Sequence, residues 1–199
     1  MKAKLRLIGG QRLESPNDKD TRPTTLRVRE AIFNILKNRV ENSNWLDLFC
    51  GSGAISCEAY NHGAKKIIAV DKNKKNSKIC LNNLRMLQGI EHRKNDICVI
   101  CSDVLVWTKP DYDRNELSKR INLSQLKFDF IYLDPPYEAN YYDAVLNQIS
   151  SCDFIKKNSI VICEHSPSWS IKKSILWETI DVRDYGQSRL TFLINVKNS

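Results

Sequence analysis

The sequence contains no apolar run that approaches the roughly 20 residues a membrane-spanning helix needs. Its N-terminus lacks the apolar core and small-residue cleavage site of a secretory signal peptide. No internal repeat or low-complexity tract interrupts its 199 residues. We therefore expect a cytoplasmic chain with one well-buried domain and a small extension, and not a membrane, secreted or repeat protein.

Metal ligands are also scarce, since the chain has three histidines and its seven cysteines show no paired CxxC motifs. Cys98 and Cys101 have CxxC spacing, but they fall in a strand-like run where residues three apart point to opposite faces. An odd number of cysteines scattered through apolar segments is typical of reduced, buried thiols. We predict no metal site.

Positive charge is abundant and unevenly placed. The formal net charge is +8 and the pI is about 9.1. Residues 1–40 hold ten Lys and Arg against four Asp and Glu, so they carry six of the eight net positive charges. A basic balance of this kind indicates a polyanionic partner, which the N-terminal part is expected to face.

The N-terminal part, residues 1–41, is predicted to be a basic extension of a main domain that spans 42–199. Residues 4–14 alternate basic and apolar side chains around Gly9-Gly10, which predicts a short hairpin with a cationic face, here called the N-terminal hairpin. Apolar residues then recur at helical spacing, so we expect a helix from Thr24 or Thr25 to about Val40.

From residue 42 onward, strands and helices alternate, which predicts an α/β fold with a parallel sheet and right-handed crossovers. The expected strands are 45–49, 66–70, 97–101, 128–133, 159–163, 177–182 and 190–196. The expected helices are 54–62, 73–87 (closed by Gly89), 115–121 within a charged connection, and 141–150. The last two strands are candidates for antiparallel pairing.

A glycine turn, Gly51-Ser52-Gly53, follows the first strand of this series and precedes a helix. Glycines let the backbone approach a ligand closely, and a helix N-terminus favours negative charge. A dinucleotide-binding fingerprint would have a third glycine where Ser56 stands. Asp47, just before the turn, would repel a pyrophosphate but suits the cationic amino group of S-adenosylmethionine (SAM).

Two more acids end the following strands. Asp71, twenty residues beyond Gly51, stands where an acid holds ribose hydroxyls. Asp103 is placed to accept a hydrogen bond from an adenine amine. The alternative interpretation is a glycine turn with surface acids. It is the weaker one, because three acids stand in order at the ends of three successive strands.

Asp134-Pro135-Pro136-Tyr137 ends an apolar run typical of a strand buried on both faces. Two prolines cannot continue a central strand, so the chain turns out and leaves Asp134 at the carboxyl end, where open α/β sheets place ligands. An acceptor, a rigid turn and the Tyr137 ring suit the exocyclic amine of a base. The alternative is a strand end with an Asp cap and a proline turn.

These motifs resemble known families. Asp47-x-Phe49-x-Gly51-Ser52-Gly53, Asp71 and Asp134-Pro135-Pro136-Tyr137 are similar to class I SAM-dependent methyltransferases that modify exocyclic amines. More closely, the chain resembles the RsmD-type methyltransferases of bacterial small-subunit ribosomal RNA. That resemblance rests on Arg6-Leu7-Ile8-Gly9-Gly10, on Thr21-Arg22-Pro23-Thr24-Thr25-x-Arg27-Val28-Arg29-Glu30-x-x-Phe33-Asn34 and on Tyr185-Gly186-x-x-x-Leu190. The chain departs from the family in lacking a Gly-Arg after Gly9-Gly10 and in its longer connection, 108–127.

The resemblance implies a Rossmann-like, seven-stranded, mostly parallel sheet and transfer of a methyl group from SAM to N2 of a guanine in 16S rRNA. It implies a monomer that uses no metal and acts on 16S rRNA or a small-subunit particle. The implied SAM-binding residues are Asp47, Phe49, Gly51, Ser52, Gly53, Asp71 and Asp103. The implied catalytic residues are Asp134, Pro135, Pro136 and Tyr137, and the RNA-binding candidates are Arg22, Thr24, Arg27 and Arg29.

Rival interpretations stay open at this point. Asp-Pro-Pro-Tyr also serves adenine-N6 methyltransferases, although the chain has no room for a separate DNA-recognition domain. A second rival is a non-catalytic RNA-binding assembly factor. The acids at the strand ends argue against it, since a protein without activity need not keep all four of Asp47, Asp71, Asp103 and Asp134. Arg27 is alternatively a solvated partner of Glu30, and Glu164-His165 either lines the pocket or is structural.

Overall fold

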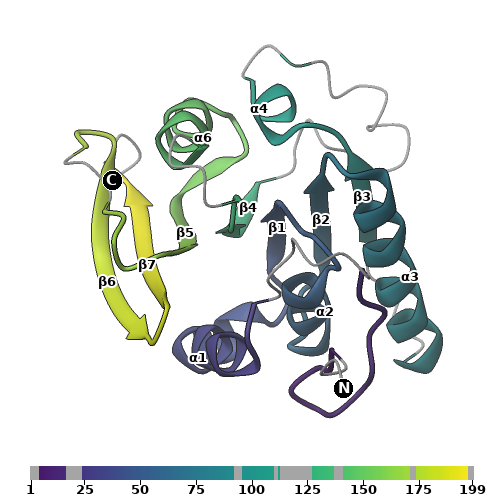
Figure 1. Cartoon of the computed structure of the whole chain (residues 1–199). Coiled ribbons are helices and arrows are strands. Elements are labelled where there is room, and N and C mark those ends of the chain that lie inside the picture. The colour runs from purple at the N-terminus through teal and green to yellow at the C-terminus, as the bar shows by residue number, and fades with distance from the viewer. Residues whose placement is uncertain are drawn as a thin grey trace. The chain divides into compact units, whose positions relative to one another are not determined.

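The computed structural model describes residues 5–16, 24–91, 96–109, 112, 127–136, 141–170 and 174–196 (Figure 1). The chain divides into two compact units, Met1–Ser102 and Asp103–Ser199. Seven strands form a mostly parallel sheet with helices, which confirms the predicted fold class. The predicted division after residue 41 stays a prediction.

The first unit holds three parallel strands of this sheet. Its elements are α1 (Leu26–Leu36), η1 (Lys37–Val40), β1 (Asn44–Leu48), α2 (Ala54–Asn61), β2 (Lys66–Asp71), α3 (Lys74–Glu91) and β3 (Asp96–Cys101). The strand order is β3-β2-β1, and Figure 1 shows the three strands side by side. The register sets Asp47 opposite Ala69 and Asp71 opposite Cys101.

Helix α1 begins where its sequence predicts. The Thr25 hydroxyl caps it by accepting a hydrogen bond from the Val28 N–H at 3.3 Å. Val28, Ile32 and Leu36 form its buried stripe. The predicted helix to Val40 is a regular helix only to Leu36 and continues as the 3₁₀ turn η1.

Helix α3 is longer than predicted, because it runs through Gly89 to Glu91. A glycine inside a helix costs about 1 kcal/mol relative to alanine, and the fully buried Leu84 and Leu87 anchor the preceding turns. The prediction that Gly89 closes the helix was therefore wrong.

The second unit holds four strands, and its closing pair is antiparallel as predicted. Its elements are α4 (Val104–Trp107), β4 (Phe128–Leu133), α6 (Tyr141–Ile149), β5 (Ile155–His165), β6 (Trp177–Tyr185) and β7 (Ser188–Asn195). The strand order is β4-β5-β7-β6, in which β4 and β5 are parallel and β7 is antiparallel to both of its neighbours. The helix predicted at 115–121 lies outside the described residues.

The seven cysteines are all free thiols, as predicted, although Cys101 is exposed and Cys98 is half-buried. Across the part of the chain that the structure describes, no helix is long and apolar enough to cross a membrane. In the same residues, no group of three or more His, Cys, Asp and Glu side chains is arranged to hold a metal ion.

Candidate functional site

Asp47 lies on β1, one residue before the strand ends, and is only 1% exposed. The Ser56 hydroxyl of α2 donates a hydrogen bond to its Oδ2. Burial raises the pKa of Asp47 to about 7 and the nearby Asp71 charge adds to the rise, while hydrogen bonds from the Ser56 side chain and backbone oppose it. A cation bound beside Asp47 would stabilise the ionised carboxylate and lower that pKa. Ser56, which stands in place of a third glycine, therefore provides a hydrogen-bond donor to the Asp47 side chain.

The glycine turn needs its two glycines for different reasons. Gly51 and Gly53 both have positive φ, 53° and 76°. A Cβ on Gly53 would lie 2.4 Å from Sγ of Cys80 and 3.2 Å from the Cys80 Cα, so this glycine lets α3 pack against the turn. A Cβ on Gly51 would meet no described atom within 4 Å. Phe49, two residues before Gly51, also has a positive φ, of 66°. The open side of the turn is therefore at Gly51.

Asp71 fixes the glycine turn to the start of α3. Its Oδ2 accepts a hydrogen bond from the Gly51 N–H at 2.9 Å, and its Oδ1 accepts one from the Asn73 N–H at 2.7 Å. The residue is 8% exposed. Each carboxylate oxygen has more than one acceptor position, so the same carboxylate has acceptor capacity left for ribose hydroxyls.

Asn83 is a residue that the sequence reasoning missed. It is 2% exposed on α3, and its side-chain amide forms hydrogen bonds with backbone groups of both Glu14 and Ser52. The signal was present in the sequence, because Asn83 stands at helical spacing among the buried positions Cys80 and Leu87. A polar residue on such a stripe is buried with partners.

Asp103 follows β3 and caps the short helix α4, since its Oδ1 accepts a hydrogen bond from the Leu105 N–H at 2.8 Å. This helix was not predicted. The contact to an adenine amine stays a prediction.

The Asp134-Pro135-Pro136 stretch leaves β4 as predicted, since the strand ends at Leu133. Asp134 is half-buried, Pro135 is buried and Pro136 is exposed. Every residue of β4 except Asp129 is buried, and Leu133 pairs with Cys163 of β5. Tyr137 lies outside the described residues.

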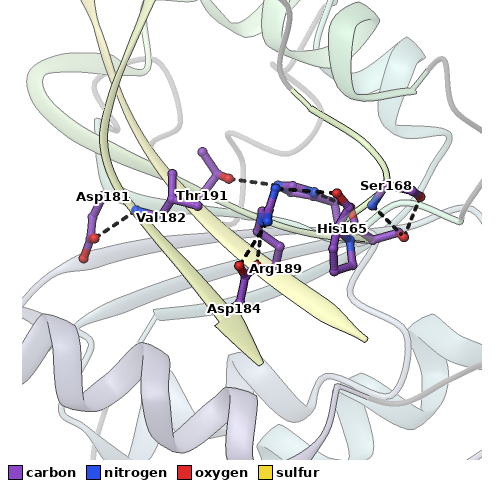
Figure 2. Close-up of polar contacts among 9 residues, drawn as sticks. His165, Ser168, Asp181, Val182, Asp184, Arg189 and Thr191 are labelled. Carbon is purple, nitrogen blue, oxygen red and sulfur yellow. Dashed lines mark hydrogen bonds and ion pairs between the residues drawn. The ribbon is translucent and has the colours of Figure 1, made fainter. Parts of the chain in front are cut away.

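Glu164 and His165, at the end of β5, are held by internal bonds. The Glu164 carboxylate accepts hydrogen bonds from the hydroxyls of Tyr132 and Ser188. The His165 ring lies 2.8 Å from the Ser166 carbonyl through Nδ1 and 2.8 Å from the Thr191 hydroxyl through Nε2 (Figure 2). Because a carbonyl only accepts, Nδ1 carries the proton and Nε2 accepts from Thr191.

Burial lowers the pKa of His165, which favours this neutral ring. Figure 2 also shows the Arg189–Asp184 ion pair, with Nε and Oδ1 2.6 Å apart. These contacts favour the structural interpretation of Glu164 and His165 over a pocket lining.

The RNA-binding candidates fall in different environments. Arg27 is exposed on α1, and Thr24 is half-buried before it. Arg29 is 2% exposed, lies 3.3 Å from the Glu58 carboxylate and donates to the Arg6 carbonyl at 2.6 Å. A buried guanidinium with these partners is not available to a phosphate. Arg22 lies outside the described residues.

The seven-stranded sheet, with its glycine turn and strand-end acids, defines a class I methyltransferase. A family model described as Conserved hypothetical protein 95 matches residues 5–194. The chain belongs to this family, and the resemblance to RsmD-type methyltransferases is confirmed.

Curated relatives carry the name "Ribosomal RNA small subunit methyltransferase D". The one from Buchnera aphidicola (strain APS) is 28% identical over 164 residues, covering 82% of this chain and 77% of the relative. The one from Haemophilus influenzae is 26% identical over 167 residues, covering 82% and 79%.

Two solved structures share the fold. A hypothetical protein of Thermus thermophilus is 24% identical with a TM-score of 0.72, covering 96% of this chain and 99% of that one. TrmN from Thermus thermophilus is 16% identical with a TM-score of 0.60, covering 85% and 48%.

Proposed function

We propose that this chain transfers a methyl group from SAM to the exocyclic N2 amine of a guanine in 16S rRNA, either as RNA or within a small-subunit particle. The observation that carries the proposal is Asp134, held at the carboxyl end of the buried strand β4 with Pro135 turning the chain away behind it. The names of the curated relatives support ribosomal RNA as the substrate. A monomer that acts in the cytoplasm, where ribosomes assemble, completes the proposal.

The residues around the glycine turn fit SAM. Asp47 would hold the amino group, because a cation offsets the cost of ionising this buried acid. Asp71 would hold the ribose hydroxyls, and the open side of Gly51 would face the cofactor. Asp103 would accept from the adenine amine. When bound, SAM supplies an electrophilic methyl on a positively charged sulfur.

Asp134 addresses the poor nucleophilicity of an aromatic amine, whose lone pair is delocalised into the ring. Hydrogen bonds from the amine to the Asp134 carboxylate and to a backbone carbonyl near Pro135 would localise that pair for in-line attack. In the transfer, the new N–C bond would form as the S–C bond breaks, with S-adenosylhomocysteine as the leaving group, and the proton lost by the amine would pass to the Asp134 carboxylate or to water. Tyr137 would stack on the base and contribute ~1–3 kcal/mol.

The N-terminal hairpin carries a charge arrangement that suits a phosphate backbone. Arg6 and Arg12 face each other across an antiparallel bridge, and both are exposed. Like charges directly opposite each other are destabilising, and a bound polyanion removes that penalty. We propose that these two arginines and the exposed Arg27 contact RNA.

The test is transfer of labelled methyl from SAM to RNA of a strain that lacks this gene, followed by nucleoside analysis. We expect N2-methylguanosine. N6-methyladenosine would favour the adenine methyltransferase, and RNA binding without any transfer would favour the assembly factor.

A further inference from the structure

We infer that Asn83 is a positioning residue that ties the N-terminal hairpin to the glycine turn, so that cofactor binding and hairpin ordering reinforce each other. The inference rests on the proposed function in taking the glycine turn as part of the SAM site. It concerns only the first compact unit, Met1–Ser102, where all of these residues lie.

The Asn83 amide uses its hydrogen-bonding groups on two segments at once. Its Oδ1 accepts from the Glu14 N–H at 2.8 Å, and its Nδ2 donates to the Glu14 carbonyl at 3.0 Å and to the Ser52 carbonyl at 2.9 Å. A side-chain amide has two N–H donors, so one goes to each segment. All three partners are backbone groups, and the tie therefore fixes chain positions instead of side chains.

The glycine turn depends on such outside bonds, because glycines on both sides of Ser52 leave its backbone loosely restrained. Asp71 holds the Gly51 N–H at 2.9 Å, and Asn83 holds the Ser52 carbonyl. Cys80, one helical turn before Asn83, fills the space beside Gly53. One face of α3 therefore sets the shape of the turn.

The N-terminal hairpin depends on outside bonds as well, since an isolated two-stranded hairpin is at best marginally stable in water. Its own bonds include those from the Leu7 N–H to the Gln11 carbonyl at 2.9 Å and from the Leu13 N–H to the Leu5 carbonyl at 3.0 Å. Glu58 accepts from the Ile8 N–H at 2.8 Å near the tip, and Asn83 anchors the far end at Glu14.

Because one amide serves both segments, a displacement of the chain at Glu14 removes two of the three hydrogen bonds that orient the Asn83 side chain, and its remaining bond to the Ser52 carbonyl is then less firmly held. A ligand that orders the turn must then lower the cost of ordering the hairpin, and the coupling is reciprocal. The hairpin bears Arg6 and Arg12, so RNA should bind more tightly to the cofactor-loaded protein.

The test measures hydrogen exchange at the Leu7 and Leu13 amides of the full chain, with and without S-adenosylhomocysteine. We expect the ligand to slow exchange at both amides about fivefold or more in the wild type. In Asn83→Ala we expect about tenfold weaker S-adenosylhomocysteine binding by calorimetry and no added protection.

Asn82→Ala and Glu14→Ala are the matched controls. The Asn82 Nδ2 donates to Oε2 of Glu14 at 3.3 Å on the surface, so each control removes a side-chain bond to the hairpin while the backbone bonds of Asn83 stay. Both should keep wild-type affinity and wild-type protection. Asn83→Asp, which keeps the size and the acceptor but lacks both donors, is a second variant that should behave as Asn83→Ala does.

Two results would overturn the coupling and leave methyl transfer standing: ligand binding to the wild type with unchanged exchange at Leu7 and Leu13, or full protection in both Asn83 variants. The wild-type measurement can overturn the coupling even where a variant does not fold. Absence of S-adenosylhomocysteine binding to the wild type would overturn both proposals. Protection without methylation of RNA would overturn the proposed function alone.

Discussion

Single residues set the chemistry, and Asp47 shows how burial does so. Its pKa of about 7 in the folded chain lies well above the usual 3.8 for this side chain, so the folded state holds a proton that the unfolded state releases. The sign follows from linkage: the stability that Asp47 contributes is fully present below about pH 4 and is lost as pH rises through about 7.

We therefore predict opposite pH trends for ligand binding and for apo stability. S-adenosylhomocysteine should bind more tightly as pH rises towards 7, by up to about tenfold per unit, because its amino group pairs with the ionised acid. The Tm of the ligand-free protein should fall over the same range. Calorimetry and melting curves from pH 5 to 8 check both trends, and Asp47→Asn should lose them. A wild-type affinity that does not vary with pH would contradict the assignment.

Asp134 gives the second residue-scale prediction. Asp134→Ala should reduce single-turnover methylation ~10²–10⁴-fold, the range for a positioned proton-handling group. Affinity for S-adenosylhomocysteine should not change, because Asp134 is proposed to face the base. A variant that methylates at the wild-type rate would mean that Asp134 only caps the strand end.

At the scale of elements, the buried Arg29–Glu58 pair links α1, α2 and the N-terminal hairpin. Glu58 also accepts the Ile8 N–H at 2.8 Å, and burial raises the pKa of Glu58 while that bond and Arg29 oppose the rise. Glu58→Ala would leave Arg29 buried without this partner.

We predict that Glu58→Ala destabilises the protein by ~3–5 kcal/mol, the usual cost of breaking a buried pair. Urea unfolding measures the loss. The double variant Arg29→Met with Glu58→Leu should recover part of it, because no unpaired charge is then left in the interior. An equal loss in the double variant would show that the effect comes from packing or from the lost hydrogen bonds to the hairpin backbone, and not from an unpaired buried charge.

The cationic surface gives the second prediction for elements. Arg12→Ala with Arg27→Ala should weaken RNA binding and flatten the log–log salt slope by ~0.7 for each lost contact on single-stranded RNA. The Tm should change little, since both side chains are exposed. Lys157→Ala, an exposed cation of the other compact unit, is the control. A salt slope equal to that of the wild type would remove these arginines from the RNA surface.

For the whole molecule, the sequence predicted what depends on local patterns. The apolar runs located the strands, and Gly51-Ser52-Gly53 located the turn between β1 and α2. The burial of Arg29 escaped prediction because its partner Glu58 is 29 residues away. The role of Asn83 escaped for the same reason, since Glu14 lies 69 residues from it.

The tie between Asn83 and Glu14 also changes how the N-terminal part is understood. From the sequence, residues 1–41 are predicted to be a basic extension of the main domain. Hydrogen bonds to Asn83 and Glu58 join its hairpin to the helices around the glycine turn. Point substitutions on the exposed surface therefore test RNA binding more cleanly than a deletion does.

The placement of β7 between β5 and β6 has a consequence for biosynthesis. A ribosome makes β5 and β6 first, so the strand that separates them in the sheet emerges last of the three. Until Ser188 and Thr191 have been translated, the Glu164 carboxylate and the His165 ring each lack one of their hydrogen-bond partners. The second unit therefore completes its strands only after β7 has been translated, whereas the glycine turn and its helices have by then already been synthesised.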